Sequence, residues 1–320
     1  MESLDSLSSI VDDATNGGNL LPRVAVLLAT HNGQCFIREQ VDSILDQQGV
    51  EIQIHASDDS STDGTLVLLA ALARVDRRLH VLPPGRFGSA ADNFLSLLRW
   101  LSLDGYDYVA FADQDDVWLP DKLHRAIMHL SAAGADGYSS DLLAFDTATG
   151  EEWIVRKSAA ARKLDYLFGG ASAGCTYVMT ARAAAVVRGA IVSNPARGWS
   201  HDWLIYAICR SNGLSWVFDR ESRIRYRQHS SNAYGARSGL RGAMKRVSQV
   251  ANGWYCEQIL ENGKFLAGQA EERKVLDRLA RLSALDRVWL ALNGWRFRRR
   301  RFDGFALSMF APFMGLSVPR

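Results

Sequence analysis

The sequence predicts an α/β protein with an open, mostly parallel sheet flanked by helices, followed by a helical and basic C-terminal extension. Strand-length apolar runs alternate with amphipathic stretches over roughly the first 130 residues, which is the β-α-β pattern of a sheet covered by helices on both faces. The run at residues 23–29 is apolar after its first residue, as expected of a strand buried on both sides. Beyond residue 236, apolar residues recur at helical spacing among many arginines.

The expected elements follow one another in a regular order. We expect strands at residues 23–29, 51–57, 79–82 and 106–112. Helices are expected at residues 36–47, 65–75, 91–103 and 120–133 in this half, and at residues 240–250, 255–266 and 271–292 in the extension. The first helix places its apolar side chains on one face, and Pro120 suits the first turn of the fourth.

The composition excludes several classes of protein. Of the 320 residues, 48% are hydrophobic and 22% are charged, so the chain can bury a core and is not disordered. Four cysteines, none in a Cys-x-x-Cys pair, predict neither a disulfide framework nor a structural zinc site, so we expect a reducing, cytoplasmic location. Residues 1–22 lack the features of a signal peptide and are expected to form a flexible tail. No apolar stretch of about 18 residues predicts a membrane-spanning helix.

The charge is distributed unevenly along the chain. From Arg237 onward there are 13 arginines and 3 lysines against 7 acidic residues, a net charge of +9. Because the whole chain carries +2, residues 1–236 carry −7. This asymmetry suggests cation-assisted chemistry in the first part and contact with an anionic surface in the second.

Polar residues follow three of the four expected strands at the point where each ends. The segments are THNG at residues 30–33, SDDSSTDGT at residues 57–65 and DQDD at residues 113–116. In open parallel sheets, ligands bind beyond the carboxyl ends of the strands. We therefore expect these three segments to line the functional site.

The DQDD segment predicts a divalent metal site. Three carboxylates within four residues repel one another and raise each other's pKa unless a cation lies among them. Carboxylates and substrate phosphates are typical ligands of Mg²⁺ and Mn²⁺, so a phosphorylated ligand is expected. The alternative for DQDD is a solvated turn in which Asp116 caps the following helix. The alternative for SDDSSTDGT is a turn whose Ser, Thr and Asp side chains cap a helix. The fingerprints of a dinucleotide fold and of a P-loop are both absent.

Taken together, these motifs resemble family 2 glycosyltransferases with the GT-A fold. VAVLLATHNG, ASDDSSTDGT and FADQDDVWLPDKL occur in that family's order, each at a strand end. The resemblance continues through a glycine-rich segment at residues 169–176, WSHDW at residues 199–203 and YRQHSSN at residues 226–232. The last of these is similar to the rhamnosyltransferase-like branch.

The resemblance implies a GT-A catalytic domain at residues 23–235. Its Rossmann-like nucleotide-sugar-binding half would be residues 23–135 and its acceptor-binding half residues 136–235. Residues 236–320 would form the helical, basic C-terminal region.

The resemblance also implies roles for particular residues. The second acid of the family's first acidic pair binds the pyrimidine base, and here it is Asp59. The implied nucleotide-sugar-binding residues are Thr30, Asn32, Asp58, Asp59, Asn93, Asp113 and Gln114. The implied ligands of Mg²⁺ or Mn²⁺ are Asp113, Asp115 and His229. The implied acceptor-binding residues are Gly170, Gly174, Trp199, His201 and Trp203.

Asp202 is the candidate catalytic base in this resemblance. It also opens an expected helix, where capping is the alternative role of such an acid. The residue before it is usually an acid in the family and is His201 here, so that acid's secondary role does not carry over. Structural roles are the alternatives for His229 and for the tryptophans, Trp199 and Trp203, which are otherwise expected to stack on sugar rings.

The function implied is metal-dependent, inverting transfer of a sugar, with rhamnose expected, from a dTDP- or UDP-sugar to a hydroxyl group. The acceptor would be a bacterial cell-surface glycan or a lipid-linked precursor of lipopolysaccharide, O-antigen or exopolysaccharide. The alternatives are a sugar-phosphate nucleotidyltransferase, whose basic glycine-rich loop is absent after the first strand, and a catalytically inactive glycan-binding module.

The arginines and aromatic residues at positions 295–302 precede an apolar segment at residues 305–314. This pattern favours peripheral contact with the anionic inner face of the cytoplasmic membrane. A solvated charged face is the alternative, and no nucleic-acid partner is expected.

Overall fold

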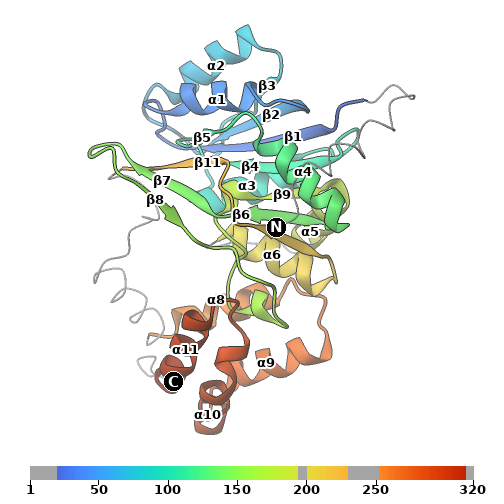
Figure 1. The fold of residues 1–320 in the computed structure, drawn as a ribbon, viewed down its shortest axis with the longest axis vertical. Coiled ribbons are helices and arrows are strands. Elements are labelled where there is room, and N and C mark those ends of the chain that lie inside the picture. Colours follow the sequence, from blue (N-terminus) through green and yellow to red (C-terminus); the bar gives the residue numbers. More distant parts are fainter. Residues whose placement is uncertain (1–19, 194–199, 230–251, 315–320) are drawn as a thin grey trace, which may run out of the picture.

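The computed structural model describes residues 20–193, 200–229 and 252–314 (Figure 1). Trp199, the helix expected at residues 240–250 and most of the expected N-terminal tail lie outside the described residues. The strands form a main sheet and a smaller second sheet.

The main sheet has seven strands in the order β10-β6-β9-β4-β1-β2-β3. They are β1 (Arg23–Thr30), β2 (Glu51–Asp58), β3 (Leu79–Val81), β4 (Tyr108–Ala112), β6 (Gly137–Ser140), β9 (Val178–Thr180) and β10 (Trp216–Asp219). β1 pairs in parallel with β2 and β4, whereas β9 is antiparallel to β4 and β6. The predicted open, mostly parallel sheet is confirmed, and the carboxyl ends of β1, β2 and β4 meet at one edge.

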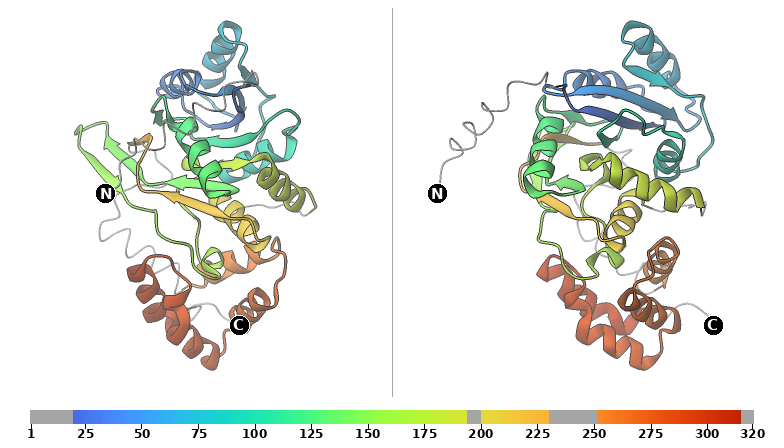
Figure 2. Two further views of the ribbon diagram at one scale, coloured as in Figure 1. Left: turned by 45° about the vertical axis from the view of Figure 1, so that its right-hand side comes forward. Right: turned by 90° about the vertical axis from the view of Figure 1, so that its right-hand side faces the viewer.

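Helices cover both faces of the main sheet (Figures 1 and 2). One face carries α1 (Ile37–Leu45), α2 (Thr65–Val75) and α4 (Lys122–Ala133), and the other carries α3 (Ala90–Trp100), α5 (Ala181–Ser193) and α6 (His201–Ser211). Alternate residues of β1 explain this arrangement. Val26 and Leu28 join the core under the first set of helices, and Leu27 joins the core under the second. The strand is therefore apolar throughout because both of its faces are buried.

The smaller sheet brings two distant parts of the chain together. Its strands are β5 (Val117–Trp118), β11 (Ile224–Gln228), β7 (Leu142–Asp146) and β8 (Glu152–Val155), in that order. β5 directly follows the DQDD segment, and β11 ends immediately before His229. The antiparallel pairing of β5 with β11 therefore places His229 near the acidic segment.

The C-terminal helices share a core with the sheet. They are α8 (Trp254–Gly263), α9 (Ala270–Arg281), α10 (Ala284–Asn293) and α11 (Arg301–Phe310), and Figure 2 shows them together at one end of the molecule. Ile259, Val275 and Leu290 belong to the same apolar core as Phe168 and Trp203. Within the described ranges, no helix has the length and apolar character needed to cross a membrane.

The single helix expected at residues 271–292 is wrong, because the chain forms α9 and α10 there. Leu282 adopts a left-handed conformation, with φ 45°, which ends α9. Ser283 then caps α10, since its hydroxyl accepts a hydrogen bond from the Asp286 amide at 3.2 Å and the Asp286 carboxylate accepts one from the Ser283 amide at 3.3 Å. This capping box starts a new helix even though the apolar spacing runs on without a break.

Candidate active site

The loops after β1 and β2 are held together by Asp58 and Asn32. Asp58 is fully buried, and its carboxylate accepts hydrogen bonds from Thr30 Oγ1 at 2.8 Å and from the amide and hydroxyl of Ser61 at 2.8 and 2.6 Å. Asn32 Oδ1 accepts a hydrogen bond from the Thr62 amide at 2.8 Å. Both side chains therefore shape this edge of the sheet by fixing its loops.

Gln114 ties the third loop to the first. Its Oε1 accepts a hydrogen bond from the His31 amide at 2.8 Å, and its Nε2 donates to the His31 carbonyl at 2.9 Å. A side chain at Gly33 would displace the Gln114 amide and so disturb its hydrogen bonds to His31. The three predicted segments thus form one connected edge.

Asp59 binds the loop that follows β3. Its two carboxylate oxygens accept hydrogen bonds from the amides of Phe87 and Gly88 at 2.6 and 2.9 Å. Asn93 is buried nearby, where its Nδ2 donates to the Ser57 carbonyl at 3.0 Å, and its Oδ1 has no hydrogen-bond partner within the described chain. Asp59 and Asn93 therefore both lie at the end of β2, and Asn93 Oδ1 is an acceptor without a hydrogen-bond partner among the described residues.

The acidic segment and His229 meet as the pairing of β5 and β11 requires. His229 Nε2 lies 2.9 Å from Asp115 Oδ2. The ligand atoms of Asp113, Asp116 and Cys175 all lie within 4.8 Å of one another. Asp116 is fully buried, and its Oδ2 has no hydrogen-bond partner among the residues described. An orphaned carboxylate oxygen inside an acidic cluster is a site that a cation would satisfy.

The raised pKa values of this cluster also favour a bound cation. Burial, together with the charges of Asp115 and Asp202, raises the pKa of Asp113 to about 7. Burial and the neighbouring carboxylates also raise the pKa of Asp116. A divalent cation among these groups would remove the repulsion. Burial raises the pKa of the Cys175 thiol as well, so the available donors are carboxylate oxygens and imidazole nitrogen, which suit Mg²⁺ or Mn²⁺.

Arg227, on β11, holds the acidic segment in place. Its Nε donates to the Asp115 carbonyl at 2.7 Å, and its amide donates to Asp116 Oδ1 at 3.2 Å. The His229 ring stacks on Phe36, with centroids 4.7 Å apart. The motif YRQH therefore supplies both a candidate ligand and the residue that fixes its partners.

A cleft of about 240 Å³ opens beside Asp202. Three residues predicted from the resemblance line it, namely Gly170, Trp203 and Asp202 itself. None of the candidate metal ligands lines this cleft. The link between them is Cys175, whose thiol lies within 4.8 Å of ligand atoms of Asp113 and Asp116 and which follows Gly174, the residue packed against the His201 ring. The candidate base on α6 therefore lies near the acidic segment.

Asp202 lies in the first turn of α6. Its Oδ1 accepts hydrogen bonds from the Trp203 amide at 2.7 Å and from the Ser200 hydroxyl. Within the described chain, no hydrogen bond engages its Oδ2. One oxygen therefore caps the helix while the other remains free to accept a proton, so the capping role and the catalytic role are compatible.

The remaining predicted acceptor residues pack closely around this helix. A Cβ on Gly170 would lie 3.2 Å from Trp203 Cα, and one on Gly174 would collide with the His201 ring. His201 packs on Phe94 with ring centroids 4.2 Å apart. Trp203 is buried, and its indole Nε1 donates to the Tyr166 carbonyl at 2.8 Å. Trp203 thus has little exposed surface with which to stack on a sugar ring.

Comparison with known proteins decides the family. The Glycosyl transferase family 2 model matches residues 25–186. The "dTDP-rhamnosyl transferase RfbG" of Shigella flexneri is 34% identical over 281 residues, which cover 86% of this chain and 96% of that protein. The chain belongs to glycosyltransferase family 2. The expected likeness to the rhamnosyltransferase-like branch is confirmed, and the enzyme class sets aside the nucleotidyltransferase and the inactive binding module.

Other relatives match part of this glycosyltransferase or share its fold. The "Putative teichuronic acid biosynthesis glycosyltransferase TuaG" of Bacillus subtilis is 34% identical over 109 residues, 34% of this chain and 42% of that protein. The crystal structure of S. aureus TarS 1-349 in complex with UDP-GlcNAc has a TM-score of 0.55 at 17% identity, covering 89% of this chain and 75% of that one. The GT-A fold expected from the sequence is confirmed.

Sequence reasoning missed several residues that line the cleft beside Asp202. Lys157 and the arginines Arg298, Arg299 and Arg300 line the cleft beside Asp202. The run of arginines was visible in the sequence, but it was interpreted only as a surface feature. No local pattern indicates that a turn before α11 reaches a cleft formed some 130 residues earlier.

Proposed function

We propose that this glycosyltransferase transfers rhamnose from dTDP-rhamnose to a hydroxyl group of a cell-surface glycan, with inversion and with Mg²⁺ or Mn²⁺. The observation that carries the proposal is the similarity to the Shigella flexneri dTDP-rhamnosyl transferase over 86% of this chain and 96% of that protein. Similarity along nearly the whole length of both proteins includes the acceptor half, which a match to the nucleotide-binding half alone would not.

The donor is bound at the edge formed by the first three loops. Asp59 and Asn93 offer hydrogen-bond acceptors to the base and the ribose, and Thr30, Asn32, Asp58 and Gln114 hold the loops in place. Binding of the base at Asp59 replaces the hydrogen bonds that Phe87 and Gly88 now make to it.

Asp113, Asp115 and His229 would hold the divalent cation. When bound, the cation supplies positive charge that stabilises the departing nucleoside diphosphate. Arg227 keeps Asp115 and Asp116 in place through hydrogen bonds from its side chain and backbone. The raised pKa of Asp113 means that this residue gives up a proton when the site fills near neutral pH.

Asp202 accepts the proton of the attacking acceptor hydroxyl. Its free Oδ2 faces no competing hydrogen bond from the described residues, and it lines the cleft in which the acceptor would lie. A single displacement, with the acceptor and the leaving group on opposite faces of the sugar, inverts the anomeric carbon. A positioned base contributes about 10²–10⁴-fold to such a reaction.

The C-terminal helices favour a site of action at a membrane surface. Leu285, Val288 and Leu292 on α10, and Phe302, Phe305 and Met309 on α11, are each about half or more exposed. In both helices the spacing is i, i+3 and i+7, so each presents an apolar stripe. The same region of the sequence is rich in arginine, and exposed apolar side chains together with arginines are expected of a surface that binds anionic lipid from the cytoplasmic side.

A donor panel tests this function. The purified enzyme is heated with dTDP, dTDP-rhamnose, UDP, UDP-GlcNAc or GDP-mannose, each with Mn²⁺, Mg²⁺ or EDTA. We expect dTDP-rhamnose with a divalent cation to raise the melting temperature most, because a ligand that binds the folded state stabilises it. The largest shift with a UDP- or GDP-sugar, or equal shifts in EDTA, would contradict the proposal.

A further inference from the structure

The cleft beside Asp202 contains more cations than its carboxylates neutralise. Lys157, Arg298, Arg299 and Arg300 line it together with Asp165, Asp202 and Asp303. The three arginines come from the turn before α11, and Lys157 comes from the segment that follows β8. One wall of the acceptor cleft is therefore built by the C-terminal region.

Two of these cations are structural. Arg299 Nη2 donates to the Gly170 carbonyl at 2.8 Å, and its Nε lies 3.5 Å from Asp165 Oδ2. Arg298 donates to the Phe168 carbonyl and pairs with Asp303 at 3.7 Å. Both arginines thus hold the glycine-rich segment against the C-terminal region, and their charges are matched by carboxylates.

Among the described residues, Lys157 and Arg300 have no carboxylate partner. Within residues 20–193, 200–229 and 252–314, neither makes an ion pair within 4 Å with any carboxylate. Arg300 donates only to the carbonyl of Arg156, at 3.1 Å, which places it next to Lys157 in space. Lys157 and Arg300 are both exposed. Partial desolvation within the cleft lowers the pKa of Lys157, the charges of Asp202 and Asp303 oppose that shift, and the charges of Arg300 and Arg298 add to it. Among the described residues, Lys157 and Arg300 thus add two cations to the cleft wall that no ion pair neutralises, although Asp202 and Asp303 line the same cleft. Such an excess of positive charge favours binding of an anion.

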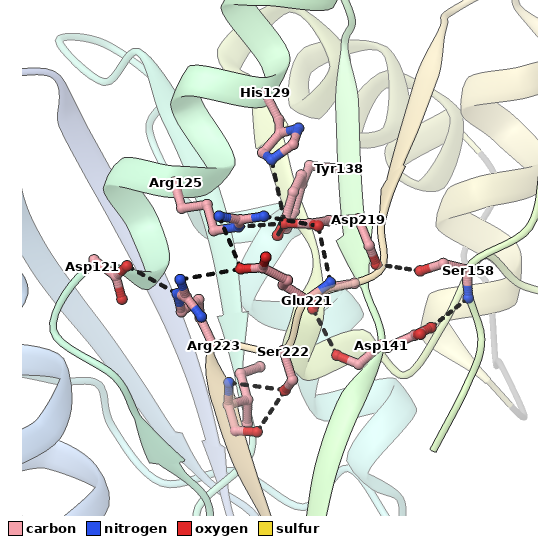
Figure 3. Close-up of polar contacts among 12 residues, drawn as sticks. Asp121, Arg125, His129, Tyr138, Asp141, Ser158, Asp219, Glu221, Ser222 and Arg223 are labelled. Atoms are coloured by element: carbon pink, nitrogen blue, oxygen red, sulfur yellow. Dashed lines mark hydrogen bonds and ion pairs between the residues drawn. The ribbon is translucent and has the colours of Figure 1, made fainter. Parts of the chain in front are cut away.

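A buried polar network fixes the segment that carries Lys157 (Figure 3). The amides of Lys157 and Ser158 both donate to Asp141 Oδ1 at 2.6 Å. The Ser158 hydroxyl donates to the carbonyl of Asp219, whose carboxylate accepts a hydrogen bond from Arg125 Nε at 2.6 Å. The backbone under Lys157 is therefore held in place before any ligand binds, which reduces the entropy cost of binding.

We propose that Lys157 and Arg300 bind a phosphate or diphosphate group carried by the acceptor. This inference rests on the proposed function, because it places the acceptor hydroxyl at Asp202. The diphosphate of the donor belongs at the acidic segment with its cation, so an anion at the basic wall comes from a different molecule. The apolar stripe of α11 begins two residues after Arg300, which favours an acceptor whose phosphate links the glycan to a lipid.

The test measures binding of inorganic pyrophosphate, farnesyl diphosphate and farnesol to the whole enzyme in EDTA. EDTA prevents binding of diphosphate at the metal site. We expect both diphosphates to bind and farnesol to bind at least tenfold more weakly than farnesyl diphosphate. The double substitution Lys157→Gln and Arg300→Gln should weaken binding of both diphosphates at least tenfold, and each single substitution should weaken it less. Tighter binding of farnesyl diphosphate than of pyrophosphate identifies a lipid phosphate, and equal binding identifies a free or soluble phosphate ester.

Arg301→Gln is the matched control, because Arg301 is the next arginine in the run, is exposed and does not line the cleft. It should leave diphosphate affinity within twofold. All variants should bind dTDP with Mn²⁺ as the wild type does. If the wild type itself does not bind dTDP with Mn²⁺, the result counts against the proposed function and not against this inference. If the double variant fails to fold, the single variants decide the question. Diphosphate affinity that is unchanged in the variants, or equal losses in Arg301→Gln, would overturn the inference.

Discussion

Asp113→Asn is expected to make the metal-free enzyme more stable, although it removes a candidate metal ligand. Burial and the charges of Asp115 and Asp202 raise the pKa of Asp113 from 3.8 to about 7. At about 1.4 kcal/mol for each tenfold change in proton affinity, this difference corresponds to roughly 4 kcal/mol of penalty on the ionised folded protein. Asp113 is partly exposed, so solvent screening reduces the penalty. We expect the variant to gain about 2 kcal/mol in free energy of unfolding at pH 8.

The gain depends on pH in a defined direction. The unfolded chain loses the Asp113 proton near pH 4, whereas the folded protein keeps it up to about pH 7. The folded state therefore binds more protons between these values, and the stability of the wild type falls as pH rises through this window. The difference between variant and wild type should be small near pH 4, grow up to pH 7 and remain constant above it.

Urea unfolding in EDTA at pH 5 and pH 8 measures this difference. Asp42→Asn is the control, because Asp42 is an exposed aspartate on α1 and its substitution should change stability little at either pH. Adding Mn²⁺ at pH 8 should stabilise the wild type and leave Asp113→Asn nearly unchanged, which reverses their order. A variant no more stable than the wild type at pH 8 in EDTA would refute the electrostatic account of the acidic segment.

Three further outcomes are expected. Asp202→Asn should lower the rate of sugar transfer by about 10²–10⁴-fold while dTDP affinity with Mn²⁺ stays within twofold, and an equal loss of donor affinity would contradict its role as base. Arg299→Met should lower the free energy of unfolding by about 1–3 kcal/mol, because it removes the hydrogen bond to the Gly170 carbonyl and one partner of the buried Asp165 carboxylate, which keeps Tyr206 and Arg210; a change under 0.5 kcal/mol in urea unfolding would show that the C-terminal region is not anchored there. Phe305→Ser with Met309→Ser should reduce sedimentation with vesicles that contain anionic lipid, and unchanged sedimentation would argue against the apolar stripe as a membrane contact.

The edge of the main sheet was predictable because its signals are local. An apolar run followed by a polar turn marks the end of a buried strand, and parallel strands end at the same edge. THNG, SDDSSTDGT and DQDD therefore had to lie near one another once β1, β2 and β4 were known to be parallel. Spacing does not distinguish a residue that touches a ligand from one that holds a loop. Asp58 and Gln114 form hydrogen bonds to neighbouring loops, and only the folded structure shows this.

The rest of the site depends on contacts between distant segments. His229 reaches Asp115 because the short strand β5 pairs with β11 across more than 100 residues, and two-residue strands leave no pattern in a sequence. The break between α9 and α10 depends on one left-handed residue, Leu282. Leucine rarely adopts that conformation, so the apolar periodicity predicted one helix where two exist.

The charge asymmetry of the chain shows how a correct observation supports more than one interpretation. An acidic first part and a basic last part suggested two separate tasks, metal chemistry in front and contact with a surface behind. The structure brings both kinds of charge near Asp202, since Lys157 and Arg300 line the same cleft as Asp202, and the Asp202 charge adds to the effects of burial and Asp115 that raise the pKa of Asp113. In the proposed function, the acidic side would need a cation before a nucleoside diphosphate binds, whereas the basic side would bind an anion without one. Two phosphorylated substrates would then be kept apart, because each phosphate group would be bound by a different kind of positive charge.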